Sequence, residues 1–322
     1  MRPVVLDVDT GVDDAGAILL AARHPELDLR AVSCVAGNAP VDDVVRNTLT
    51  VLQTCGRGDV PVGRGAPRPL LEPPRPARHV HGEDGMGDLG WPAPELRPDP
   101  RHAVELLRDV LLDAAADPDP DRWVTLVPLA PLTNIALLLR TYPAAAAGLR
   151  EIVFMGGAAH VGNATASAEF NVFHDPEAAA IVLDAAAQLG IPTTMYGLDV
   201  FYAPTVTRRR AAALIAVGGR GPAELAGRLV DFQCERFGTQ EATIGDAGAV
   251  CAVLDPAGLT CKRLPVRVEL AGRWSRGRTV VDRRDWSGDR AHDPHDPAHV
   301  IDVALGVDGP RYRRLWLDAV GR

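Results

Sequence analysis

Short, continuously apolar runs alternate along the chain with longer segments whose apolar residues recur at helical spacing. The runs are rich in β-branched residues, which is typical of parallel strands covered on both faces. They lie at 3–9, 29–37, 123–130, 151–157 and 191–200. The helical segments lie at 13–23, 40–55, 101–116, 132–140 and 176–189. This alternation predicts βαβ units, and so an α/β, Rossmann-like domain with a mostly parallel central sheet flanked by helices.

Two segments depart from this alternation. Residues 267–284 contain two β-type runs around an Arg/Gly-rich turn, which predicts a late antiparallel hairpin. Residues 61–100 are rich in proline and glycine, but strand–helix units resume after them. We therefore expect a long active-site lid loop there and not a linker between domains. No second core is evident, so residues 1–322 are expected to form a single domain.

Composition excludes several classes of protein. The net charge is −8, so a general binder of nucleic-acid backbones, which normally shows a basic face, is not expected. Nearly all the positive charge is arginine, and Lys262 is the only lysine. No apolar run approaches the ~18 residues needed to span a membrane, and the first residues do not resemble a signal peptide. The five cysteines contain no CxxC pair, which favours reduced thiols in a cytoplasmic protein.

Four carboxylates gather where the first strand gives way to a helix, in LDVDTGVDDAGAILLA (6–21). They are Asp7, Asp9, Asp13 and Asp14. A helix N-terminus stabilises one or two negative charges, hardly four. A hard divalent cation would neutralise the others, and calcium or magnesium suits a cluster that has no His/Cys set at zinc spacing. The alternative is that Asp9 or Thr10 caps the helix while the other acids are solvated.

Two further motifs suggest weaker alternatives. DVDT resembles the start of haloacid-dehalogenase-type magnesium phosphatases, but Gly11 follows at once, and Lys262 stands in a poor context for the cation such a site needs. The histidine-rich stretch at 291–299 could bind a surface metal. Its prolines favour an exposed loop instead.

Six blocks spread in order along nearly the whole chain resemble the inosine-uridine-type nucleoside hydrolases. They are DVDTGVDDAGAILLA, VAGNA (35–39), LVPLAPLTNIA (126–136), FMGGAAHVGNATASAEFNVFHDPEAA (154–179), GDAGAVCAVLDP (245–256) and RGRTVVDRR (276–284). The resemblance implies cleavage of the N-glycosidic bond of ribonucleosides to free base and ribose. It also implies one bound calcium, held by the side chains of Asp9, Asp14 and Asp246 and by the backbone carbonyl of Leu129.

The same resemblance implies a role for each polar residue of these blocks. Asp9 and the metal would activate a water, which attacks an oxocarbenium-like ribosyl group. The implied contacts are Asn38 to the water or the 2′-hydroxyl, Asp13 to the 2′-hydroxyl, Asn171 to the 3′-hydroxyl, and Asn163 and Glu169 to the 5′-hydroxyl. Without the resemblance, the asparagines could simply cap turns and the glutamate could be exposed.

The base would lie between the lid and a late helix. His81, in VHGEDGMG (80–87), matches a family histidine near the base pocket. Alignment on DFQCERFG (231–238) puts Gln233 and Phe237 where the family often has aromatic residues facing the base. Gln233 could bond a pyrimidine edge and Phe237 could stack on it. The alternative is that all three side chains are solvated or packed in the core.

One position departs from the family pattern. The best-studied branch has a histidine before the last metal aspartate, proposed to protonate the leaving purine, and this chain has Gly245. The acid could come from His81, Tyr202 or His174, the leaving group could need less protonation, or a larger base could be accepted.

We therefore expect a pyrimidine or unusual base as the substrate's leaving group. A non-catalytic nucleoside- or ribose-binding protein remains an alternative, although such a protein has no use for Asp9 as a base. The expected ligand in either case is a small-molecule ribonucleoside. The resemblance also implies a homodimer or homotetramer.

Overall fold

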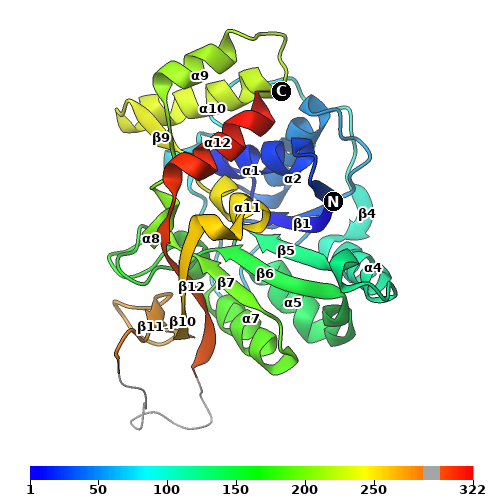
Figure 1. The fold of residues 1–322 in the computed structure, drawn as a ribbon, viewed down its shortest axis with the longest axis vertical. Coiled ribbons are helices and arrows are strands. Elements are labelled where there is room, and N and C mark those ends of the chain that lie inside the picture. Colours follow the sequence, from blue (N-terminus) through cyan, green and yellow to red (C-terminus); the bar gives the residue numbers. More distant parts are fainter. Residues whose placement is uncertain (286–297, 322) are drawn as a thin grey trace.

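A computed structural model describes residues 1–285 and 298–321, so most of the histidine-rich stretch lies outside the described residues. Its centre is a ten-stranded sheet in the order β11-β10-β12-β7-β6-β5-β1-β2-β3-β4 (Figure 1). The strands are β1 (Arg2–Val8), β2 (Leu27–Cys34), β3 (Val62–Arg64), β4 (Asp99–His102), β5 (Val124–Pro128), β6 (Leu149–Met155), β7 (Thr193–Tyr196), β10 (Leu259–Val268), β11 (Thr279–Val281) and β12 (His299–Val307). Neighbouring strands from β12 to β4 are parallel, while β10 is antiparallel to both β11 and β12. The predicted α/β class and the late antiparallel hairpin are thus confirmed.

Helices cover both faces of the sheet. One face carries α1 (Val12–Arg23), α2 (Val41–Thr54), α11 (Ala247–Leu254) and α12 (Gly309–Val320), with α9 (Arg208–Ile215) and α10 (Pro222–Phe237) beyond them (Figure 1). The other face carries α4 (Ala103–Ala115), α5 (Thr133–Thr141) and α7 (Pro176–Leu189). Successive side chains of β1 alternate between the two: Leu6 packs in one core and Val5 in the other. This double burial explains the continuous apolar runs of the sequence.

Short elements sit near the carboxyl ends of the strands. They are the helical turns α3 (Arg78–His81), α6 (Phe170–His174) and α8 (Leu198–Phe201), and a two-stranded antiparallel sheet of β8 (Thr205–Thr207) and β9 (Glu241–Thr243). Three 3₁₀ turns complete the elements, at Pro120–Arg122, Pro143–Gly148 and Pro256–Gly258.

Two expected boundaries are wrong. The apolar run at 191–200 ends as a strand at Tyr196, because Gly197 is already the N-cap of a helical turn. The chain turns there into α8. Segment 61–100 is not one continuous loop, because it contributes β3, α3 and β4. The helix predicted at 176–189 matches α7 at both ends.

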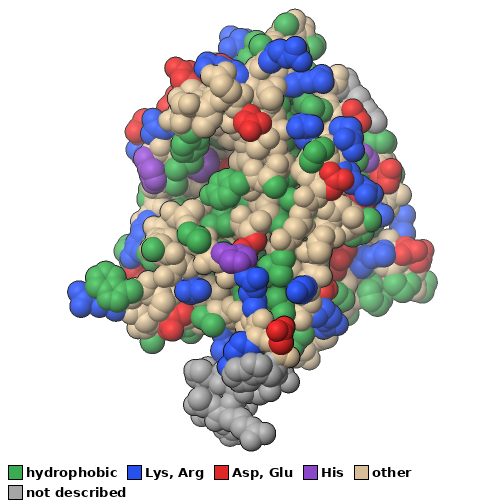
Figure 2. Space-filling model, turned by 60° about the vertical axis from the view of Figure 1, so that its left-hand side comes forward, with side chains coloured by type: hydrophobic (Ala, Val, Ile, Leu, Met, Phe, Trp, Pro, Cys, Tyr) green, Lys and Arg blue, Asp and Glu red, His purple; other side chains and the backbone are tan. Residues whose placement is uncertain are grey.

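The surface of the described residues is mixed in character. On the face drawn in Figure 2, basic, acidic and apolar side chains are interspersed. All five cysteines are free thiols, as expected. No helix among the described residues is both long and apolar enough to cross a bilayer.

Candidate active site

A cavity of about 490 Å³ opens where the carboxyl ends of the central strands meet α3, α6, α8 and α10. Ten of the twelve residues expected to bind the metal, the water or the substrate line it: Asp13, Asn38, His81, Leu129, Asn163, Glu169, Asn171, Gln233, Phe237 and Asp246. Asp9 and Asp14, the other two, are fully buried near its acidic end. Parallel strands bring these loops to one edge of the sheet, and ligands of such sheets bind there.

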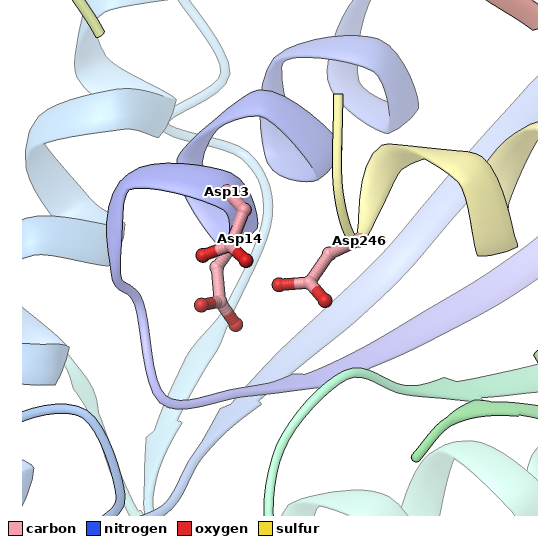
Figure 3. Close-up of side chains that lie close together, drawn as sticks. All are labelled: Asp13, Asp14 and Asp246. Carbon is pink, nitrogen blue, oxygen red and sulfur yellow. The ribbon is translucent and has the colours of Figure 1, made fainter. Parts of the chain in front are cut away.

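Three carboxylates converge at the acidic end of the cavity. Asp13 and Asp14 occupy the first turn of α1, and Asp246 directly precedes α11. One oxygen from each lies within 4.8 Å of the others, and Figure 3 shows the three groups pointing toward one another. Two helix N-termini from distant parts of the sequence therefore present their negative side chains to the same point.

The predicted alternative, capping by Asp9 or Thr10 with the other acids solvated, is wrong. Oδ2 of Asp14 accepts the Gly11 N–H at 2.9 Å, and Oδ1 accepts the Asp9 N–H at 3.2 Å. The Thr10 hydroxyl instead bonds that of Thr48 at 2.6 Å. Asp14 thus orders the turn into the helix and is itself buried.

Asp9 is held by Asn38, which lies in the loop after β2, the strand beside β1. Its Oδ2 accepts the backbone N–H of Asn38 at 2.7 Å, and its Oδ1 accepts the side-chain amide of Asn38 at 3.0 Å. A Cβ at Gly37 would lie 2.0 Å from Asp9 Oδ2, so only glycine permits this approach. The Asp9 carboxylate is therefore fixed in orientation before any ligand arrives.

Burial raises the free energy of the charged form of these acids. Desolvation, followed by repulsion from Asp13, raises the pKa of Asp14 to about 7. Desolvation and the neighbouring carboxylates also raise the pKa of Asp9 and of Asp246 well above the usual range. A cation bound among them would remove this penalty. The donor set is entirely oxygen, which fits a hard divalent ion and not zinc.

The residues expected to bind ribose also stabilise the turns that carry them. Glu169 caps α6, with Oε1 accepting the Asn171 N–H at 2.8 Å and Oε2 accepting the Gly157 and Val172 N–H groups at 2.9 and 3.1 Å. The Asn171 amide donates to the carbonyl of Leu129 at 2.9 Å. Glu169 is buried, so the alternative of an exposed glutamate is wrong. Burial raises its pKa to about 7.

Residues between 75 and 81, within the segment expected to be a lid, form another part of the cavity wall. His81 is buried, and its Nδ1 accepts the Val12 N–H at 3.1 Å, which places the imidazole proton on Nε2. Burial lowers the pKa of His81, so the ring is neutral. Arg236 of α10 donates to the His79 carbonyl at 2.6 Å and ties the lid to the helix that carries Gln233.

Gly245 cannot be replaced by a histidine in this backbone without rearrangement. Its φ is +54°, in the left-handed region that side chains rarely adopt. A Cβ would lie 2.6 Å from Cβ of Asp13 and 3.1 Å from Cζ of Phe201. The backbone conformation and the neighbours of Gly245 therefore leave no room for a leaving-group acid at this position.

Sequence reasoning missed the aromatic wall of the cavity. Phe170, Phe173 and Phe201 all line it. Phe170 could have been found, because it stands between Glu169 and Asn171 in the AEFN block, whereas the other two carry no such signal. Lys262 lies on β10 and does not line the cavity, so the only lysine of the chain is not available to a phosphatase site there.

Asp7 on β1 bonds Asn134, whose side chain also bonds the backbone near the start of segment 61–100. Oδ1 of Asp7 accepts the Ser33 hydroxyl at 2.5 Å and the Asn134 amide at 2.8 Å. The Asn134 amide also donates to the Cys34 carbonyl at 3.0 Å, and its oxygen accepts the Ala66 N–H at 2.9 Å. One buried amide thus links β1, β2, α5 and the start of the lid.

Replacing Asn134 with leucine is expected to lower the free energy of unfolding by roughly 3–5 kcal/mol, because three buried polar groups lose a partner at once. Urea titration followed by circular dichroism measures it. The control is Gln188→Leu, where an exposed amide bonds Asp184, and a change below about 0.5 kcal/mol is expected. A similar small change in Asn134→Leu would contradict the structural role of this amide.

Comparison with known proteins gives one consistent family. The family model for inosine-uridine preferring nucleoside hydrolases matches residues 4–314. The inosine-uridine preferring nucleoside hydrolase of Leishmania major is 40% identical over 100% of this chain and 98% of its own length. The pyrimidine-specific ribonucleoside hydrolase RihA of Shewanella woodyi is 40% identical over 90% of this chain and 91% of its own.

Solved structures agree. The purine-preferring ribonucleoside hydrolase from Gardnerella vaginalis superimposes with a TM-score of 0.86 at 28% identity, covering 99% of this chain and 98% of that one. The names of these similar proteins span inosine-uridine, pyrimidine and purine preference. Similarity alone therefore does not identify the base.

Proposed function

The chain belongs to the family of inosine-uridine preferring nucleoside hydrolases, enzymes that hydrolyse the N-glycosidic bond of ribonucleosides, and on that premise we propose a calcium-dependent hydrolase with a preference for pyrimidine ribonucleosides. The observation that carries the proposal is the meeting of the buried acids with Asn38, Asn163, Glu169 and Asn171 around one cavity. The acids suit a cation and a developing positive charge, and the amides suit sugar hydroxyls.

The proposed ion is Ca²⁺, held by Asp9, Asp14, Asp246 and the carbonyl of Leu129. Calcium accepts irregular sets of carboxylate and carbonyl oxygens, and these four donors come from three separate loops. The Leu129 carbonyl accepts one hydrogen bond from Asn171 and keeps a second lone pair. When bound, the ion would lower the pKa of a water and offset the repulsion among the acids.

Asp9 and Asp13 have different roles in the proposed reaction. Asp9, oriented by its two bonds from Asn38, takes the proton of the attacking water as general base. As the bond from C1′ to the base breaks, positive charge develops on the ribosyl ring. The carboxylate of Asp13 faces the cavity beside it and stabilises that charge.

Pyrimidine preference is supported by the base end of the cavity. Gln233 offers both an amide donor and an acceptor, which match the alternating carbonyl and N–H edge of uracil. Phe237, which is 58% exposed and so not a core residue, can stack on the ring. Gly245 withholds the acid proposed to serve purines in the best-studied branch.

Chromatographic detection of free base from uridine, cytidine, inosine, adenosine and guanosine tests the function directly. We expect release that requires calcium and is fastest with a pyrimidine. Faster release from a purine would overturn the preference and leave the hydrolase. No release from any nucleoside, with ribose still bound in calorimetry, would favour a binding protein.

2′-Deoxyuridine is expected to be hydrolysed about 10²-fold more slowly than uridine, because the carboxylate of Asp13 would lose its 2′-hydroxyl partner. Comparison of kcat/KM for the two substrates measures it. In Asp13→Ala the discrimination is expected to shrink. Equal rates for uridine and 2′-deoxyuridine in the parent enzyme would contradict the role of Asp13.

We further propose that the enzyme is cytoplasmic and assembles as a homodimer or homotetramer, with no nucleic-acid or membrane partner. Light scattering coupled to size-exclusion chromatography measures the assembly. A monomeric mass at micromolar concentration would contradict it.

A further inference from the structure

A departing base needs a proton donor, and position 245 cannot provide one. A side chain there would collide with Asp13 on one side and with the ring of Phe201 on the other. Phe201 belongs to α8, which follows β7 and reaches the same edge of the sheet as the acids. Phe201, the last residue of α8, therefore occupies the space in front of Gly245, and the residue that follows it is Tyr202.

Tyr202 stands beside Phe201 in the cavity wall. The two rings meet edge to face, with centroids 5.0 Å apart and planes at 82°. Both line the cavity, together with Thr243 and Asp246. Tyr202 is also 54% exposed, so its hydroxyl can exchange protons with solvent. The ring of Phe201, which a Cβ at position 245 would approach to 3.1 Å, thus packs against a phenol in the wall of the same cavity.

The hydroxyl of Tyr202 is set up as a donor. The side chain of Asn163 bonds the phenol, and because its Oδ1 already accepts the Phe170 N–H at 2.9 Å, its amide N–H is available to donate to the phenol oxygen. The phenol proton is then free to bond an acceptor in the cavity. Burial and the charges of Glu169 and Asp13 raise the pKa of Tyr202, which keeps that proton in place at neutral pH.

The histidines of the cavity are weaker candidates. The ring of His81 is neutral, and a neutral imidazole gives up its remaining proton less readily than a phenol. His174 has both ring nitrogens buried without a hydrogen-bond partner among the described residues. Neither nitrogen is exposed at the cavity surface. Of these three candidates, Tyr202 is the one that is half-exposed, lines the cavity and packs against Phe201 in front of Gly245.

We propose that Tyr202 is the catalytic residue that donates the proton to the departing base. The inference rests on the proposed hydrolase function. As the bond from C1′ to the base nitrogen breaks, its electron pair passes to the base, and the Tyr202 hydroxyl proton passes to an oxygen or nitrogen of that base. The proton of the attacking water goes to Asp9. The resulting phenolate recovers a proton from solvent through its exposed side.

The test compares two leaving groups in Tyr202→Phe, a substitution that removes one oxygen and keeps the ring. Uridine needs its base protonated, whereas p-nitrophenyl β-D-ribofuranoside releases a stable phenolate without a proton. We expect kcat for uridine to fall by ~10²-fold or more and kcat for the nitrophenyl riboside to change by less than about threefold. Tyr142→Phe, which alters a tyrosine stacked under Arg108 away from the cavity, is the matched control and should leave both rates unchanged.

Each other outcome overturns the inference in a distinct way. Equal loss on both substrates would make Tyr202 a structural residue. No loss on either would assign the proton to another donor, with His81→Gln as the next variant to compare. A parent enzyme inactive on both substrates would instead overturn the hydrolase function on which the inference rests.

Discussion

Replacing Asp9 with alanine is expected to lower kcat for ribonucleosides by ~10²–10⁴-fold, the range over which a positioned general base accelerates a reaction. The change removes the group that takes the water's proton and one of the carboxylates offered to the cation. Base release measured by chromatography gives the rate.

The fold should survive this substitution. Asp9 is a buried carboxylate whose pKa is raised by desolvation and by Asp14, so its removal relieves repulsion while it costs two hydrogen bonds from Asn38. We expect similar circular dichroism and a thermal midpoint within a few degrees of the parent. Asp59→Ala, which alters an exposed acid paired with Arg57, is the control and should keep full activity. Turnover by Asp9→Ala within about threefold of the parent would show that the water is activated elsewhere.

Much of the fold was predictable because the central strands are buried on both faces. That burial forces uninterrupted apolar runs, and β1, β2, β5, β6 and β7 were all found from them. The strands β3 and β4 were missed because they are short and lie within or at the end of a proline-rich segment, where pairing with a neighbour and not the local pattern decides the structure. The strand β12 was missed because its buried and exposed residues follow no regular alternation, so the sequence shows no clear strand pattern there.

The sequence predicted which residues form the site, but not which of their atoms bond one another. Asp9, Asp13 and Asp14 are adjacent in sequence, and the carboxyl ends of parallel strands had to meet. Which oxygen bonds which N–H could not be read from the sequence. The left-handed backbone of Gly245 and the ring of Phe201 against it depend on the approach of α8 to the turn before α11, two segments more than 40 residues apart. Tyr202 was accordingly one candidate among three until its surroundings were known.

Removal of the metal is expected to stop hydrolysis and to destabilise the protein, and the stabilising effect of calcium should grow with pH. Without a cation, burial raises the pKa of Asp14 to about 7 and those of Asp9 and Asp246 well above their usual range. The folded protein therefore holds protons that the unfolded chain releases near pH 4. Because the folded state binds more protons, the free energy of unfolding of the metal-free protein falls as the pH rises from about 4 to about 7.

Calcium replaces those protons, so it binds more tightly where they are scarce. At a calcium concentration about 100 times its dissociation constant, the gain is about 2.7 kcal/mol, or roughly 5 °C in the thermal midpoint for a chain of this size. Thermal unfolding with calcium and with chelator, at pH 5.5 and pH 8, measures it, and we expect the larger shift at pH 8. In Asp246→Asn, which keeps the shape of the side chain and removes one charged ligand, the shift should shrink at both pH values. A calcium shift that is absent, or larger at pH 5.5 than at pH 8, would contradict an ion held by these carboxylates, since protons and a cation competing for the same oxygens must oppose each other.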